Sequence, residues 1–104
     1  MGREREPCVY MLAGRRHGTL YTGVTSNLGA RLHQHRNGLI PGFTHDYDVA
    51  RLVWLERHET METAIAREKR IKKWERQWKI NMIEAENPNW DDLALDLGFP
   101  PLPA

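Results

Sequence analysis

The chain has 104 residues, the length of one domain, and its formal net charge is +1. Hydrophobic residues make up 40% of it, and four Trp, three Tyr and two Phe argue against a disordered chain. No apolar run reaches the roughly 18 residues of a transmembrane helix, and the charged start predicts no secretory signal. The single cysteine, Cys8, excludes an internal disulfide, so we expect a cytoplasmic protein that does not contact membranes.

The charge divides the chain into two parts. All 15 basic residues lie between Arg3 and Lys79, and nine acidic residues accompany them, so this part carries +6. Five acidic residues and no Lys or Arg follow Lys79, so the end of the chain carries −5. We expect a basic domain over residues 1–86, an acidic, Pro-rich tail over residues 87–104, and a polyanionic partner. The alternative is a solvated surface with segregated charges, and charge alone favours that alternative.

The first elements in chain order are a hairpin and a helix. Residues 8–13 are apolar and residues 19–24 are rich in Thr, Tyr and Val, so both segments are predicted strands. The glycine-flanked segment 14–18 joins them as a turn. Ser26 and Asn27 can cap a helix that continues to residue 36.

The second half of the chain is predicted to contain a loop, a third strand and further helix. Residues 37–48 are predicted to form a loop, and residues 49–56 a third strand. Helical character begins at residue 61, continues at least to Trp74, and extends to about residue 85. The order is strand, strand, helix, strand, helix, helix, which predicts an α/β (α+β) domain with a small sheet against helices. The third strand could pair with either strand of the hairpin.

Glu68 is the first candidate for chemistry. Its neighbours on one helix face are Ala64, Ile65 and Ile71, so its carboxylate lies within an apolar stripe. A charge there is costly unless it is paired or binds a metal. The alternative is a Glu at the rim of the stripe that pairs with Lys72, four residues further on.

Arg31 and His35 are the second candidate. They are four residues apart on the first predicted helix, beside the apolar edge that Leu28 and Leu32 form. Together they suit an anionic oxygen such as that of a phosphate. The alternative is a solvated surface pair.

Two tyrosines on the hairpin are the third candidate. If residue 12 pairs with residue 19, Tyr10 lies opposite Tyr21 and the two rings share one face of the sheet. The alternative is a pair of core tyrosines. Gly23, inside the second strand, predicts a close backbone approach or a bulge.

A basic run follows Glu68 on the predicted helix. It consists of Arg67, Lys69, Arg70, Lys72, Lys73, Arg76 and Lys79, interleaved with Trp74 and Trp78. Such a run can follow a phosphate backbone while aromatic side chains stack on bases. For the tryptophans, packing along one apolar edge with Ile71 is the favoured alternative. The histidines and Cys8 lack zinc spacing, and no Gly-rich phosphate loop is present, so we expect no small-molecule cofactor.

These residues occur in the order of the GIY-YIG nuclease superfamily. Residues 8–10 (Cys-Val-Tyr) and 21–23 (Tyr-Thr-Gly) resemble its paired motifs, and the likeness continues through Arg31, His35 and residues 66–74. It covers roughly residues 8–82 and is closest to the small single-domain bacterial members. Cys-Val replaces Gly-Ile in the first motif and Thr stands in the middle of the second, but both tyrosines and the final glycine are kept.

The resemblance implies a three-stranded antiparallel sheet and a metal-dependent endonuclease that cuts DNA. Tyr21 would help to activate the attacking water, and Tyr10 would support it. Arg31 would hold the scissile phosphate, with His35 on the phosphate side. Glu68 would ligate one Mg²⁺ or Mn²⁺ ion.

An active-site asparagine of related repair nucleases falls near Asn81, and Asn87 is its rival. On one straight helix from residue 61 to residue 82, Asn81 would point away from Glu68. The chain would have to bend near residues 74–76, where no Gly or Pro marks a bend.

We therefore expect a Mg²⁺-dependent DNA endonuclease with a role in DNA repair or processing. The basic residues Arg67, Lys69, Arg70, Lys72 and Lys73 would bind the nucleic acid. One alternative is a binding module of the same fold that cuts little or not at all, and another is a protein-interaction domain that uses the tail. Trp90 and Phe99 could dock on the body or on a partner, and both a monomer and a weak homodimer remain open.

Overall fold

The computed structural model describes residues 6–39 and 49–102. Its elements are β1 (Cys8–Ala13), β2 (Leu20–Thr25), α1 (Leu28–Arg36), β3 (Arg51–Arg57), α3 (Met61–Lys72), α4 (Arg76–Glu86) and the short 3₁₀ helix η1 (Leu93–Leu97). The predicted α+β order of strands and helices is confirmed. Most of the loop predicted over residues 37–48 lies outside the described residues. Within the described ranges, no helix is both long and apolar enough to cross a membrane.

The three strands form one antiparallel sheet in the order β2-β1-β3. The third strand therefore pairs with β1, which the sequence left open. All six residues of β1 are apolar or aromatic and have no exposed surface. A strand without polar alternation suits the centre of a sheet that is covered on both faces.

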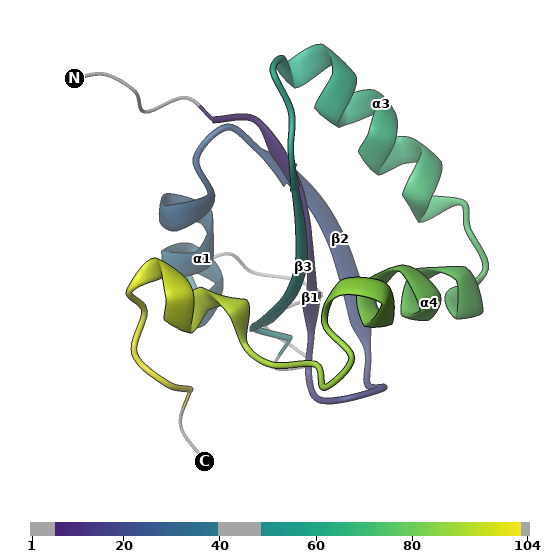
Figure 1. The fold of residues 1–104 in the computed structure, drawn as a ribbon. Helices are drawn as coiled ribbons and strands as arrows, with labels where there is room; N and C mark the ends of the chain where they lie inside the picture. Colours follow the sequence, from purple (N-terminus) through teal and green to yellow (C-terminus); the bar gives the residue numbers. More distant parts are fainter. Residues whose placement is uncertain (1–5, 40–48, 103–104) are drawn as a thin grey trace.

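Helices cover both faces of the sheet (Figure 1). Alternate residues of β1 point to opposite faces, so Val9 and Met11 lie in the core beneath α3 and α4. Tyr10 and Leu12 lie in the second core, beneath α1 and η1. Residues of β1 thus anchor both helical layers, and the tyrosine of the first motif faces α1.

The hairpin register differs from the one that would place Tyr10 directly opposite Tyr21. Leu12 pairs with Tyr21, and Tyr10 pairs with Gly23, so residue 12 does not pair with residue 19. The reason is the turn: the Gly14 N–H donates to the Thr19 carbonyl (3.1 Å), so Thr19 belongs to the turn. A shift of two residues keeps every side chain on its face. Tyr10 and Tyr21 therefore still share a face, with ring centroids 6.3 Å apart.

The helical region after residue 61 bends. The helix expected to reach at least Trp74 ends at Lys72, and α4 begins at Arg76. The last turn of α3 tightens, because the Lys73 and Trp74 N–H groups donate to carbonyls three residues back (3.1 and 3.0 Å). Glu75 then has an extended backbone, with ψ 152°. The bend lets Ile71 and Ile80 enter the same core.

The segment after α4 packs against the body. The Trp90 side chain is 1% exposed and belongs to the core beneath α3 and α4. Asp92 accepts two hydrogen bonds from Arg36 of α1 (2.6 and 2.8 Å) and one from the Leu52 N–H of β3 (3.2 Å). Trp90 therefore docks on the body of the same chain, and the segment ties α1 to the sheet.

Candidate active site

Three aromatic rings meet on the α1 face of the sheet. The His35 ring lies 6.0 Å from Tyr10 and 5.5 Å from Tyr21, in edge-on contact with both. The Tyr10 hydroxyl and His35 Nε2 are 3.1 Å apart and form a hydrogen bond. Residues from two strands and one helix thus converge, although 25 positions separate Tyr10 from His35.

The start of α1 fixes the place of His35. The Asn27 Oδ1 accepts from the Ala30 N–H (3.1 Å), and Thr25 Oγ1 accepts from the Asn27 N–H (3.0 Å). This cap joins α1 directly to the end of β2. Leu28, seven residues before His35, is buried on the same helix face, which turns the imidazole toward the tyrosines.

Burial and nearby charges set the protonation states of the hydrogen-bonded Tyr10 and His35. Burial raises the pKa of Tyr10 well above its usual value; the neighbouring Tyr21 adds to this, and Arg31 opposes it. Burial also lowers the pKa of His35, and the Arg31 charge lowers it further. Near neutral pH, the pair is therefore a phenol and a neutral imidazole. Arg31 therefore acts electrostatically on both members of the pair.

Glu68 lies on α3 with only 8% of its surface exposed, as its apolar helix face predicts. Its Oε2 is 2.6 Å from the Lys72 ammonium. The side chains are 10% and 51% exposed, so the carboxylate is nearly enclosed while the lysine reaches solvent. Pairing offsets part of the cost of burying the charge.

A hollow lies at the β2 edge of the sheet, next to the end of α3. It has a volume of about 270 Å³ and is lined by Leu20, Tyr21, Thr22, Lys72 and Lys79. β2 is an edge strand of the described sheet, so side chains from both faces can reach round it. The partner of Glu68 thereby lies on the same hollow as Tyr21.

Lys79, which the sequence placed at the end of the basic run but not among the expected DNA-binding residues, also lines this hollow. Burial lowers its pKa, and the charges of Arg76 and Lys72 lower it further. Lys79 follows Lys72 by seven residues, about two turns of a continuous helix, and this spacing is the sequence pattern that could have placed the two lysines on one face. The bend between α3 and α4 decides where the two lysines meet, and no local pattern encodes that bend.

The two candidate asparagines lie elsewhere. Asn81 is exposed on α4, and its Oδ1 accepts from Gln77 Nε2 (2.9 Å). The buried Asn87 amide donates to the Val53 carbonyl (3.1 Å) and the Asp91 carbonyl (3.0 Å), and accepts from the Asp91 N–H (3.0 Å). The bend that the assignment of Asn81 required is present, yet Asn81 pairs with its own helix. Asn87 holds the C-terminal segment to β3.

The predicted nucleic-acid-binding residues divide into two groups. Arg67 is engaged by the fold, because its Nε donates to Glu56 (3.0 Å) and its guanidinium lies over the Trp74 ring (5.4 Å). The exposed cations are Lys69, Arg70 and Lys72 of α3, and Lys73 at its C-terminal cap. Trp78 contacts Trp74 edge-on but is 55% exposed, so it is not the apolar packing residue that was favoured.

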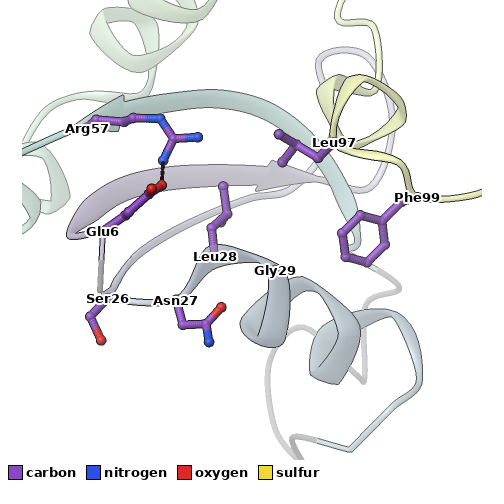
Figure 2. Close-up of a pocket in the computed structure, with 8 residues that line it drawn as sticks. All are labelled: Glu6, Ser26, Asn27, Leu28, Gly29, Arg57, Leu97 and Phe99. Carbon is purple, nitrogen blue, oxygen red and sulfur yellow. Dashed lines mark hydrogen bonds and ion pairs between the residues drawn. The ribbon is translucent and has the colours of Figure 1, made fainter. Parts of the chain in front are cut away.

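A larger hollow of about 430 Å³ lies between the start of α1 and the C-terminal segment (Figure 2). Leu28, Leu97 and Phe99 point into it, and the ion pair between Glu6 and Arg57 (2.8 Å) lies beside it. None of the candidate catalytic residues lines it. Of the candidate catalytic residues, Tyr21 lines the smaller hollow at β2.

The residues around Glu68 fit a loosely held magnesium ion. In the part of the chain that the structure describes, no three His, Cys, Asp or Glu residues gather into a metal-binding group. Mg²⁺ commonly binds one or two carboxylates, keeps several waters and takes substrate phosphates as further ligands. Glu68 already has a cation, the Lys72 ammonium, on its carboxylate. One protein ligand completed by water and phosphate is therefore the arrangement that these residues allow.

Comparisons with known proteins identify the family of the domain. A family model described as the GIY-YIG catalytic domain matches residues 6–81. A UPF0213 protein of Staphylococcus epidermidis is 37% identical over 67 residues, covering 64% of this chain and 82% of that protein. A UPF0213 protein of Staphylococcus aureus is 36% identical over the same shares. The solution NMR structure of a UPF0213 protein from Bacillus halodurans has the same fold, with a TM-score of 0.53 and 24% identity over 84% of this chain and 92% of that one. The chain therefore belongs to the GIY-YIG family of nuclease domains.

Proposed function

We propose that the protein is a divalent-metal-dependent endonuclease that hydrolyses phosphodiester bonds of DNA at the β2 edge of its sheet. The observation that carries the proposal is the cluster of Tyr10, Tyr21 and His35, with Arg31 acting on it electrostatically. Glu68 approaches the same edge from the opposite face through its partner Lys72. A role in DNA repair or processing belongs to this proposal.

Arg31 and Glu68 would stabilise the negative charge of the phosphate, Arg31 directly and Glu68 through the metal ion. The Arg31 guanidinium offers a planar fork of donors to two phosphate oxygens and stabilises negative charge as it builds up. Glu68 would hold the divalent ion, which supplies Lewis-acid charge at a phosphoryl oxygen when it is bound. The two residues come from helices on opposite faces of the sheet, so the substrate phosphate would lie across the β2 edge.

The proton of the attacking water needs an acceptor near neutral pH. Tyr10 is unsuited, because its raised pKa keeps the hydroxyl protonated. His35 is suited, because its lowered pKa leaves the imidazole neutral. Tyr21 accepts the proton of the attacking water and passes its own hydroxyl proton to Tyr10. Tyr10 in turn donates its hydroxyl proton to His35 Nε2, 3.1 Å away. The relay requires the His35 tautomer whose proton is on Nδ1.

The test is a cleavage assay on supercoiled, single-stranded and branched DNA with Mg²⁺ or Mn²⁺. We expect the wild-type protein to nick at least one substrate, and Glu68→Gln and Arg31→Ala to abolish nicking while both variants keep the wild-type circular dichroism spectrum. Glu62→Gln is the matched control, because Glu62 is an exposed carboxylate on the same helix. Cleavage that persists in Glu68→Gln would refute the proposed site.

A second candidate function is DNA binding without efficient cleavage. The exposed cations of α3 favour it, because neutralising several phosphates needs no catalytic group. This function predicts affinity that falls steeply with salt and no cleavage with any divalent metal. Cleavage that depends on Glu68 would exclude it.

A further inference from the structure

The Glu68 carboxylate is already occupied by a cation of the protein itself. The Lys72 ammonium lies 2.6 Å from Glu68 Oε2, and the two residues are one helical turn apart on α3. The carboxylate is the group that the proposed function assigns to the divalent ion, so the following inference rests on that function. We propose that Lys72 competes with the metal ion for Glu68 and transfers to a DNA phosphate when metal and DNA bind together.

Burial makes the competition direct. Only 10% of the Glu68 side chain is exposed, so its oxygens offer little open approach. A magnesium ion arrives with a shell of waters that it gives up reluctantly. The ammonium at 2.6 Å stands at one of the two oxygens, and two cations at one carboxylate repel each other. Lys72 must therefore move before a hydrated ion can bind Glu68.

The structure also provides a place for Lys72 to go. Its side chain is 51% exposed and lines the hollow that Tyr21 and Lys79 share. A phosphate in this hollow would lie between two ammonium groups and beside Tyr21. Burial lowers the pKa of Lys79, and the charges of Arg76 and Lys72 lower it further, so an anion there would relieve repulsion among these cations.

A coupling between metal and DNA follows. In the free protein, Lys72 weakens metal binding, whereas in the DNA complex it is withdrawn to the phosphate. DNA therefore strengthens metal binding, and metal strengthens DNA binding by the same factor. The exchange would keep the metal-loaded form scarce until a substrate is present.

The first experiment measures the affinity of the full chain for Mn²⁺ without DNA, by the electron paramagnetic resonance signal of the free ion. We expect Lys72→Gln to bind Mn²⁺ about two- to fivefold more tightly than the wild type, the range of an ion pair of this kind. Lys69→Gln removes the same charge from an exposed neighbour and should stay closer to the wild type. Unchanged or weaker binding by Lys72→Gln would overturn the proposal, as would unchanged binding by Glu68→Gln.

The second experiment repeats the titration with a saturating short oligonucleotide, in a Tyr21→Phe background that suppresses cleavage. DNA should tighten Mn²⁺ binding more in the chain with Lys72 than in Lys72→Gln, while Lys72→Arg keeps part of the coupling. Equal coupling in the three chains would overturn the transfer of Lys72 to DNA. Failure of the proposed function is recognised separately: a wild-type protein that shows this metal competition but never cuts DNA refutes the nuclease and leaves the exchange intact.

Discussion

Replacing Gly23 by alanine tests how tightly the hairpin holds Tyr10. Gly23 pairs with Tyr10 across the strands, and a Cβ atom at Gly23 would lie 2.6 Å from both Cζ and the hydroxyl oxygen of Tyr10. That distance is well inside van der Waals contact. The Tyr10 ring has no exposed surface, and its hydroxyl is held by His35, so it cannot move aside freely. We expect Gly23→Ala to reduce the free energy of unfolding by about 1–3 kcal/mol, the usual cost of overpacking a core.

The assay is urea unfolding followed by tryptophan fluorescence, together with the cleavage rate. Gly29→Ala is the matched control, because its new Cβ would meet only the Asn27 Oδ1, at 3.8 Å, within α1. Alanine in place of a helical glycine should stabilise the protein by up to about 1 kcal/mol. The cleavage rate of Gly23→Ala should fall by more than the loss of folded protein accounts for, because displacing Tyr10 breaks its hydrogen bond to His35. Wild-type stability and activity in Gly23→Ala would refute the close contact and the positioning argument with it.

Three further predictions concern burial and charge. Asp92→Ala should lower the free energy of unfolding by about 3–5 kcal/mol in urea titrations, because the nearly buried Arg36 would lose its carboxylate partner; a loss below about 1 kcal/mol would contradict the ion pair. Trp90→Ala should cost about 3–5 kcal/mol in the same assay, whereas Trp78→Ala, at a site 55% exposed, should cost far less; equal losses would show that the burial assignments are wrong. Because the pKa of His35 is lowered in the folded protein, the unfolded chain binds a proton at this residue at a higher pH than the folded chain does. The free energy of unfolding should therefore fall as the pH drops below about 6.5, and His35→Gln should make it less dependent on pH. An unchanged pH dependence in His35→Gln between about pH 7 and pH 5 would contradict the buried neutral imidazole.

Local patterns were sufficient to predict the elements and the burial of Glu68. The apolar positions around Glu68 placed its carboxylate on the core face of α3, where it is 8% exposed. Gly23 predicted the close approach that Tyr10 makes. The burial of Glu68 follows from its spacing along one helix, and the close approach of Tyr10 follows from the absence of a side chain at Gly23.

The partner of β3 and the bend after α3 were not predictable in this way. Strand pairing depends on which apolar surfaces pack together in the fold, and the sequence of β3 alone does not specify which strand lies beside it. The bend at residues 73–75 has no Gly or Pro, and it forms because Ile71 and Ile80 must both reach one core. The basic run already included Lys79, but its place on the hollow beside Tyr21 depends on that bend and could not be predicted.

The role of Glu68 is tested most directly by the initial rate of Mg²⁺-dependent DNA cleavage by the wild type and by Glu68→Gln, purified side by side and equally folded. We expect cleavage that requires the divalent ion in the wild type and no cleavage above background in Glu68→Gln. Equal rates for the two proteins, or wild-type cleavage that persists after the metal is chelated, would contradict this role.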